Sequence, residues 1–506
     1  MQTGMTPSAK TTFQGVNPRP SSRHTSFTFQ GVARLGLGAI AWGLLILFGL
    51  TVAHLTWLVT LALVILGEGP ASDDVLPVLL PIFIVITLVM AALVARFISS
   101  LPKVAAAIGV IFAIIWGIQT AGALKSSDWA LYQARAIAWG ESDVKDYQKF
   151  PQRPMANAAS AFQFAKGQPL QLGTIEYKSG EKTKQADFET FLKSTNTTSF
   201  IVIKDGQIRY EGYFNGYSRD SIVTSFSVAK SFVSALTGVA ISEGYIGSVD
   251  DKITIYLPEL RGKGFDDVTI RHLLTMSSGV RYITNDEASF LRMITLRSEQ
   301  TLAYYHPNLR ARLLHDIEPD GRAAGARYKY NDYLPQLVGV ILERTTQRPV
   351  SQYLEEKLWK ALGTEFPASW SLDSNKSGFE QMQSGINARA IDFAKFGQLF
   401  LDSGVWGGKQ LIAASWVKES TSPDPNDTRP WDLDDEGWKD AGGYYKYLWW
   451  GIPNADGTYD YVARGHLGQK IYVSPRDNAV IVRFGSNDGG VDKWEDVLAD
   501  VIAALR

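Results

Sequence analysis

A long apolar region near the N-terminus constrains this chain more than any other feature of its sequence. Residues 35–67 contain no Asp, Glu, Lys or Arg, and two further apolar runs follow over residues 75–95 and 104–124. A helix of about 20 apolar residues crosses a bilayer. Soluble cores rarely contain three such runs in succession, and the first run is too long and begins too late for a cleaved signal peptide. We therefore expect three transmembrane helices within residues 34–124.

The charges that flank these runs indicate how the chain crosses the membrane. Residues 1–34 carry four basic residues and no acidic one, residues 68–74 carry three acidic residues, and residues 96–103 carry two basic residues. Basic flanks stay on the cytoplasmic side. Three spans therefore place the N-terminus in the cytoplasm and everything after residue 124 outside it, so that a multi-pass protein of the inner membrane faces the periplasm. Few polar residues interrupt the runs, which favours an anchor over a transport path.

The composition excludes several classes of function. Basic and acidic residues almost balance, 50 against 51, and there is no basic tract, so no nucleic-acid partner is expected. The chain has no cysteine, which excludes disulfides, thiolate metal sites and a cysteine nucleophile. The histidines lack the spacing of metal ligands, so we expect neither a metal nor another cofactor.

Four regions follow from these patterns. Residues 1–33 are rich in Ser, Thr, Gln and Pro and are expected to form a disordered cytoplasmic tail. Residues 34–124 are the three-helix membrane anchor, with the lipid bilayer as partner. Residues 125–165 are predicted to be a tether, and residues 166–506 a soluble domain.

The soluble domain begins and ends with strand patterns. Asp205-Gly206 lies between two β-prone runs, 200–203 and 208–213, which predicts a hairpin. Residues 249–401 are largely helical with long loops. The helices expected between and after the strands cover residues 225–243, 270–276, 332–345, 350–362, 388–401 and 491–504. The late strands are expected over residues 444–451, 459–463, 469–473 and 479–484. This order predicts an α+β fold in which one sheet is assembled from both ends of the domain, with a cleft beside a helical subdomain.

The pair Ser227-x-x-Lys230 is the strongest candidate for chemistry. Residues three apart share a face of a helix, so the amine can reach the hydroxyl. Burial and the positive end of the helix both lower the pKa of a lysine, and a neutral amine can then take the serine proton. The same spacing begins at Ser100, Ser142, Ser179 and Ser415. Only Ser227 follows a strand pair and opens an apolar helix, so we predict Ser227 as the nucleophile.

Four blocks of sequence make this prediction more specific. They cover residues 224–232, 268–279, 328–333 and 464–475. In content and order they resemble the serine β-lactamase and penicillin-binding protein superfamily, and more narrowly its class C-like esterases and 6-aminohexanoate-dimer hydrolases. The likeness spans roughly residues 150–506. It implies a β-lactamase-like domain, in which an antiparallel sheet is flanked by helices and joined to a helical subdomain.

The resemblance also assigns a second motif. Tyr330 matches its tyrosine, and a phenol beside a lysine can pass a proton to the leaving group. The family pattern is Tyr-x-Asn, but the third position is Asp332 here and Asn331 lies between. Either side chain could orient the substrate or the lysine.

A third motif falls at His466-Leu467-Gly468, where β-lactamases have Lys-Thr-Gly. The glycine lets a substrate approach the strand edge closely, and the histidine is expected to contact substrate rather than to move protons. By the same resemblance, the backbone N–H of Gln469 is the second oxyanion donor beside the N–H of Ser227.

These residues predict a serine hydrolase that acts through an acyl-enzyme on a small-molecule ester or amide. A small ester, a linear oligoamide and a cell-wall peptide all fit, whereas the missing lysine of the third motif disfavours a true β-lactamase. The alternative is a catalytically silent sensor or scaffold of the penicillin-recognising type. The oligomeric state is left open.

Overall fold

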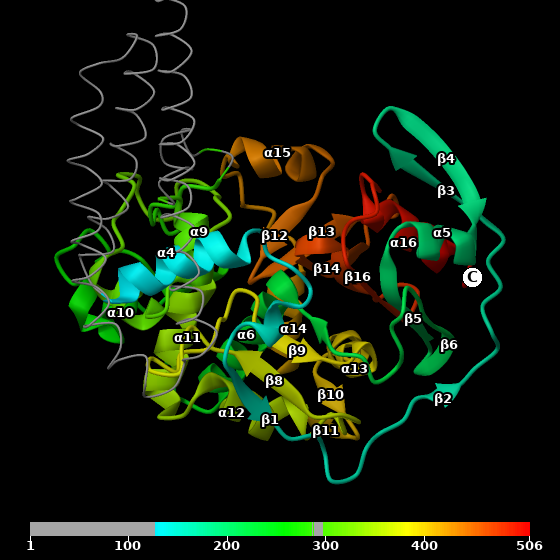
Figure 1. Ribbon diagram of the computed structural model, residues 1–506, viewed down its shortest axis with the longest axis horizontal. Helices are drawn as coiled ribbons and strands as arrows, with labels where there is room; N and C mark the ends of the chain where they lie inside the picture. The colour runs from blue at the N-terminus through cyan, green and yellow to red at the C-terminus, as the bar shows by residue number, and fades with distance from the viewer. Residues whose placement is uncertain (1–126, 286, 288–296) are drawn as a thin grey trace, which may run out of the picture. The chain divides into compact units, whose positions relative to one another are not determined.

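A computed structural model describes residues 127–285, 287 and 297–506. The predicted cytoplasmic tail and all three predicted membrane spans lie outside these residues. Among the helices that are described, none is long and apolar enough to span a bilayer. The described residues belong to one compact unit, in which a large sheet is flanked by helices (Figure 1).

Within the described residues, an eight-stranded sheet forms the centre of the domain. Its order is β12-β13-β14-β15-β16-β5-β6-β2, and the neighbours are antiparallel except for β2 and β6. The strands are β2 (Ala165–Lys166), β5 (Thr197–Lys204), β6 (Gln207–Tyr213), β12 (Tyr444–Lys446), β13 (Trp449–Pro453), β14 (Tyr459–Gly465), β15 (Gln469–Ser474) and β16 (Ala479–Gly485). Because β16 pairs with β5, the prediction of one sheet built from both ends of the domain is confirmed.

The predicted hairpin is formed by β5 and β6. Asp205 and Gly206 connect them with φ of 52° and 69°. Two successive left-handed residues give the turn whose twist matches that of the flanking strands. The Asp-Gly pair therefore fixes where β5 ends.

Helices cover the sheet and fill the helical subdomain. They are α5 (Phe188–Ser194), α6 (Ala229–Ser242), α7 (Ile270–Leu274), α9 (Glu299–Tyr305), α10 (Leu309–His315), α11 (Tyr333–Thr346), α12 (Val350–Leu354), α13 (Ala390–Leu401), α14 (Ala414–Thr421), α15 (Leu433–Asp440) and α16 (Trp494–Ala503). Helix α13 lies across β16, β15 and β5, and α6 packs against α11. The helix that follows Ser227 is thus held inside the domain.

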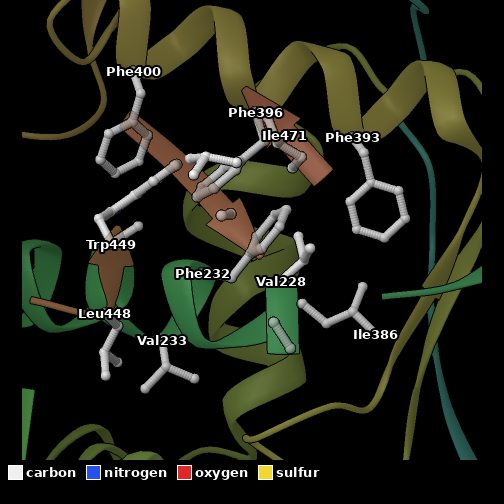
Figure 2. Close-up of a cluster of buried hydrophobic side chains, with 14 of the residues drawn as sticks. Val228, Phe232, Val233, Ile386, Phe393, Phe396, Phe400, Leu448, Trp449 and Ile471 are labelled. Atoms are coloured by element: carbon white, nitrogen blue, oxygen red, sulfur yellow. The ribbon is translucent and has the colours of Figure 1, made fainter. Parts of the chain in front are cut away.

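The N-terminal half of α6 is packed into the core of the domain. Figure 2 shows Phe232 of α6 against Phe396 of α13, and the two rings are stacked with centroids 3.6 Å apart. Trp449 of β13 and Ile471 of β15 belong to the same cluster, and all four side chains are almost fully buried. Each such side chain contributes roughly 1.5–3 kcal/mol on burial. This packing anchors the helix on which Lys230 lies.

The segment predicted as one strand over residues 444–451 is two strands. Tyr447 and Leu448 have φ of 42° and 66° and turn the chain between β12 and β13. Both side chains are buried, and neither is a residue that usually marks a turn. The apolar pattern therefore runs on through the turn and conceals it. The predicted helix over residues 350–362 likewise divides into α12 and a π-helical turn, η5 (Glu355–Trp359).

Three smaller sheets lie outside the central one in the described part of the chain. Their orders are β1-β8-β9-β7, β3-β4 and β10-β11. The strands are β1 (Gln152–Met155), β3 (Thr174–Ser179), β4 (Lys182–Asp187), β7 (Val223–Thr224), β8 (Ala368–Ser371), β9 (Ile386–Ala388), β10 (Val405–Trp406) and β11 (Lys409–Gln410). The sheet that contains β7 leads directly into the turn of Ser227.

The segment predicted as a tether, residues 125–165, packs against the domain over much of its length. Its helix α4 (Ser127–Trp139) lies against α9, with Tyr132 buried between them. Arg135 is also buried, and its guanidinium donates to the carbonyl oxygens of Tyr305 and Asp373. Strand β1 follows and pairs with β8. These contacts give the segment fixed partners on the domain surface.

Candidate active site

Ser227 lies in a single 3-10 turn, η2 (Phe226–Val228), which leads directly into α6. Phe226 has φ of 44°, a conformation that residues with a Cβ rarely adopt. The hydroxyl of Ser225 donates to the carbonyl oxygen of Ser384 at 3.1 Å and fixes the start of the turn. Strain of this kind persists only where the surroundings impose it, and it clusters at functional sites. Ser227 itself is partly exposed.

The ammonium group of Lys230 faces three oxygen atoms. Its Nζ donates to Ser227 Oγ at 2.7 Å and to the carbonyl oxygen of Gln383 at 3.0 Å. Asp332 Oδ1 lies 2.7 Å from the same nitrogen, and the lysine side chain is 2% exposed. The structure therefore brings together the serine and lysine that the spacing predicted, and it adds Gln383, which the sequence analysis did not identify.

The protonation state of Lys230 differs from the expected one. Burial lowers the pKa of the amine, but the Asp332 carboxylate and Tyr330 raise it by more, so the pKa lies above its ordinary value. Lys230 is therefore charged at neutral pH, and the expectation of a neutral amine is wrong. The physical reason is the carboxylate, because an opposite charge within contact distance stabilises a buried ammonium.

Tyr330 meets both members of this pair. Burial raises the pKa of its phenol above the ordinary value, and the charge of Lys230 together with hydrogen bonds to Lys230 and Ser227 offsets only part of this effect. The ring centroid lies 4.8 Å from Lys230 Nζ. Trp450 stacks on the ring at 5.8 Å with an interplanar angle of 29°. Tyr330 is thus a neutral phenol held between the ammonium and an indole.

Asn331 and Asp332 take different roles. Asn331 is buried, and its side chain bonds to the backbone of Val280 at 3.2 Å and of Tyr333 at 2.8 Å. Asp332 turns the other way, toward Lys230, and its second oxygen accepts a hydrogen bond from the Tyr282 hydroxyl at 3.0 Å. The question that the sequence left open is answered: Asp332 faces the lysine, and Asn331 stabilises the start of α11.

The third motif forms the turn between β14 and β15, and β14 packs against η2. His466 is exposed and its ring meets Phe226 edge-on, with centroids 5.5 Å apart. Gly468 has φ of 79°, and a Cβ there would collide with the guanidinium of Arg483. The side chain of Gln469 bonds to both backbone groups of Gly485. Only its backbone N–H remains a candidate oxyanion donor.

Arg483 stabilises this turn through hydrogen bonds to its backbone. The sequence analysis did not identify this residue. Its guanidinium is fully buried and donates to the carbonyl oxygens of Leu467 and Gly468 at 3.0 Å each, and to that of Thr195 at 2.9 Å. The ring of Trp494 lies 4.2 Å from it. An arginine within an otherwise apolar strand was the signal that could have revealed it.

A cationic and aromatic rim adjoins Tyr330. The guanidinium of Arg464 lies 4.8 Å from the ring of Trp450 and 4.6 Å from that of Trp438. Glu495 holds the same guanidinium by an ion pair of 3.0 Å. The cluster of tryptophans late in the sequence was the available signal for this rim. Within the part of the chain that the structure describes, no group of three or more acidic residues or histidines could hold a metal ion.

These features define the site of a serine hydrolase with a lysine and a tyrosine at its nucleophile. Residues 185–503 match the model of the family described as Beta-lactamase. The match covers more than half of the chain, so the protein belongs to this family and is a serine hydrolase.

Individual relatives agree with the family. A protein of Paenarthrobacter ureafaciens named 6-aminohexanoate-dimer hydrolase is 27% identical over 333 residues, which are 64% of this chain and 82% of the relative. A solved structure described as a putative 6-aminohexanoate-dimer hydrolase from Bacillus anthracis superposes with a TM-score of 0.60 at 23% identity, over 72% of this chain and 92% of its own. A putative β-lactamase from Bacteroides dorei gives a TM-score of 0.52 at 16% identity, over 62% and 96%. The two solved structures show a shared fold.

Proposed function

We propose that this protein is a membrane-anchored serine hydrolase that cleaves an ester or amide through an acyl-enzyme on Ser227. The observation that carries the proposal is the 2.7 Å contact between Lys230 Nζ and Ser227 Oγ, with the phenol of Tyr330 hydrogen-bonded to both residues. A serine hydroxyl is a weak nucleophile until a neighbouring group relieves it of its proton. This group of three supplies that function.

The proposed reaction has two stages. Ser227 Oγ attacks the substrate carbonyl, the serine proton passes toward Lys230, and Tyr330 protonates the leaving group. A water molecule then hydrolyses the acyl-enzyme. Backbone N–H groups of Ser227 and Gln469 stabilise the oxyanion in both stages. Because Lys230 is already an ammonium, it can accept the serine proton only if it gives up one of its own.

Several observations bear on the substrate. The relative named 6-aminohexanoate-dimer hydrolase favours a linear amide, and small esters and cell-wall peptides remain compatible with the same chemistry. His466 replaces the lysine of the β-lactamase motif, which argues against a β-lactam as the natural substrate. We assign His466 to substrate contact, because its side chain is exposed beside Phe226 of the nucleophile turn.

The location of the site is part of the proposal. Three apolar runs within residues 34–124 and the alternation of charge around them support an anchor with its catalytic domain on the periplasmic face of the inner membrane. The substrate would then be met outside the cytoplasm.

One observation favours a second candidate, a silent sensor or scaffold. Lys230 Nζ donates a hydrogen bond to Ser227 Oγ instead of accepting one, which also fits a site that binds a carbonyl ligand without turnover. The two candidates differ in whether an adduct on Ser227 is released.

Labelling with a fluorophosphonate separates them. The full-length protein is treated with the probe, and the labelled peptide is identified by mass spectrometry, with Ser227→Ala as the control. The same two proteins are assayed on p-nitrophenyl esters, short linear amides, D-Ala-D-Ala peptides and nitrocefin. We expect an adduct on Ser227 and turnover of at least one substrate that the variant lacks. An adduct without turnover would support the sensor, and the absence of an adduct would remove Ser227 as the nucleophile.

A further inference from the structure

The carboxylate of Asp332 contacts the lysine of the nucleophile pair. It follows Asn331 at the N-terminal end of α11, and its Oδ1 lies 2.7 Å from Lys230 Nζ. The lysine side chain is 2% exposed and the aspartate 21%. The contact is an ion pair rather than an aligned hydrogen bond. At this distance Oδ1 is close enough to Nζ to take a proton from it.

The partners of Lys230 explain why such an acceptor is needed. Nζ has three protons and four oxygen neighbours, namely Ser227 Oγ, the carbonyl oxygen of Gln383, Asp332 Oδ1 and the phenol of Tyr330. The amide carbonyl and the neutral phenol are poor proton acceptors, and the serine must itself lose a proton. The carboxylate is therefore the one neighbour that can leave Nζ free to act as a base.

We infer that Asp332 is the terminal proton acceptor of a relay that runs from Ser227 through Lys230. The inference rests on the proposed function, in which Ser227 is the nucleophile. As the bond between Ser227 Oγ and the substrate carbonyl carbon forms, the serine proton passes to Nζ and one proton of Nζ passes to Asp332 Oδ1. The pair thus changes from ammonium and carboxylate to ammonium and carboxylic acid, and the negative charge moves to the oxyanion.

The second half of the step restores every group. When the bond from the carbonyl carbon to the leaving group breaks, Tyr330 Oη gives its proton to the leaving atom. Lys230 then reprotonates Tyr330, and Asp332 returns its proton to Lys230. The serine proton has been replaced by the acyl group, and one proton has reached the leaving group, so protons and charge balance. Water follows the same path in reverse during deacylation.

The surroundings of Asp332 suit this role. On α6 it faces Lys230, and on its own segment it lies beside Tyr330 and Tyr333. From the loop after α7, the Tyr282 hydroxyl donates to Oδ2 at 3.0 Å. That hydrogen bond leaves Oδ1 as the oxygen that receives the proton. Farther away, Arg312 and Glu299 are paired with each other beneath Tyr333 and add little net charge.

The unaltered protein provides the first test. The rate of acylation by a p-nitrophenyl ester is measured from pH 6 to pH 9, with the rate of Ser227→Ala subtracted. A relay that ends on Asp332 predicts a rate that stays level across this range, because the charged pair is the active form throughout. A lysine that must first lose its proton to water predicts a rise of about tenfold per pH unit. That rise would overturn the relay.

Asp332→Asn provides the second test. The amide cannot take a proton, so Lys230 must be neutral before Ser227 attacks the carbonyl. The profile of the variant should therefore show an acid limb within the range from pH 6 to pH 9, where the parent profile is level. At pH 6 the variant should be about 100-fold slower than the parent, and the difference should narrow toward pH 9. Asp332→Glu keeps the carboxylate and should recover the level profile. A variant Asp332→Asn with the parental profile, or one that is faster at every pH, would contradict the relay.

Two controls keep the outcomes apart. Tyr282→Phe removes a hydrogen bond to Asp332 but leaves the carboxylate, so the profile should keep its shape. Fluorophosphonate labelling of each variant at pH 9 shows whether the site is folded. If Ser227→Ala is as active as the parent, the proposed function fails. If only the profiles disagree, Ser227 remains the nucleophile and the role of Asp332 alone is rejected.

Discussion

Gly465 of β14 lies so close to Ser225 that a Cβ added to the glycine would stand 2.5 Å from the serine carbonyl oxygen. That carbonyl belongs to the turn that presents Ser227, so the strand edge and the nucleophile are held at a fixed separation. Gly465→Ala should push β14 away from η2 and lower the turnover of an ester about 100-fold, because a displacement near 1 Å at the reacting groups costs about that much. Gly173→Ala has open space around its Cβ and is the matched control. Equal rates in the two variants would show that the separation is unimportant.

Lys230→Ala should slow acylation by about 10²- to 10⁴-fold, because the hydroxyl of Ser227 loses its only amine neighbour among the described residues. The decisive measurement is the burst of p-nitrophenol in a stopped-flow experiment. Lys418→Ala is an unusually close control, since Lys418 follows Ser415 at the same spacing on α14 but is exposed. Its burst should match that of the parent.

Tyr330→Phe should also slow acylation by two or more orders of magnitude, and more for amides than for p-nitrophenyl esters. The amine of an amide is a poor leaving group and needs the proton that the phenol supplies, whereas p-nitrophenolate leaves without one. Comparison of kcat/KM for one ester and one amide checks this. An equal loss on both substrates would assign Tyr330 to orientation of Lys230 instead.

Glu495 should make the stability of the domain depend on acid pH. Burial by itself would raise the pKa of this carboxyl, but the charges of Lys470 and Arg464 lower it to about 2. A carboxyl with a depressed pKa in the folded state stabilises above its unfolded pKa, and this stabilisation is lost as the pH falls toward 2. Glu495→Gln should therefore lower the free energy of unfolding at pH 7 by about 3 kcal/mol, which a thermal melt would show as a lower Tm. Its stability should then fall less than that of the parent between pH 5 and pH 2. Asp496→Asn, exposed on the same helix, should leave both quantities unchanged.

The absence of cysteine allows a direct test of membrane orientation. Lys409→Cys places a thiol on an exposed strand of the domain, and Ser8→Cys places one in the N-terminal tail. In intact cells, a membrane-impermeant maleimide should label the first protein and reach the second only after the membrane is permeabilised. The opposite pattern would reverse the proposed topology.

The sequence predicted what depends on near neighbours. The contact between Ser227 and Lys230 follows from a spacing of three residues on a helix, and the hairpin at Asp205 follows from the residues of the turn itself. The pairing of the first and last strands was predicted from their order along the chain. The first two predictions rest on local patterns, and the third rests on the order of the elements along the chain.

What the sequence did not reveal depends on distant contacts. The second motif suggested that Asn331 or Asp332 could orient the lysine, but Asp332 lies far from Lys230 along the chain, so the pattern did not show which of the two does so or that a carboxylate keeps the amine charged. The turn at Tyr447 was hidden because its side chains are buried against the rest of the domain. Arg483 was missed because its partners are backbone carbonyl oxygens, which leave no trace in the sequence.

Because α4 is docked on the domain, only a short length of chain connects the domain to the third apolar run. The third apolar run ends at residue 124 and α4 begins at Ser127, so at most about 10 Å of chain lies between them. With Arg135 and Tyr132 fixing α4 to the domain, a membrane-anchored enzyme of this kind cannot sweep a large volume of solvent. If the run forms the proposed anchor, so short a connection would keep the catalytic domain near the membrane.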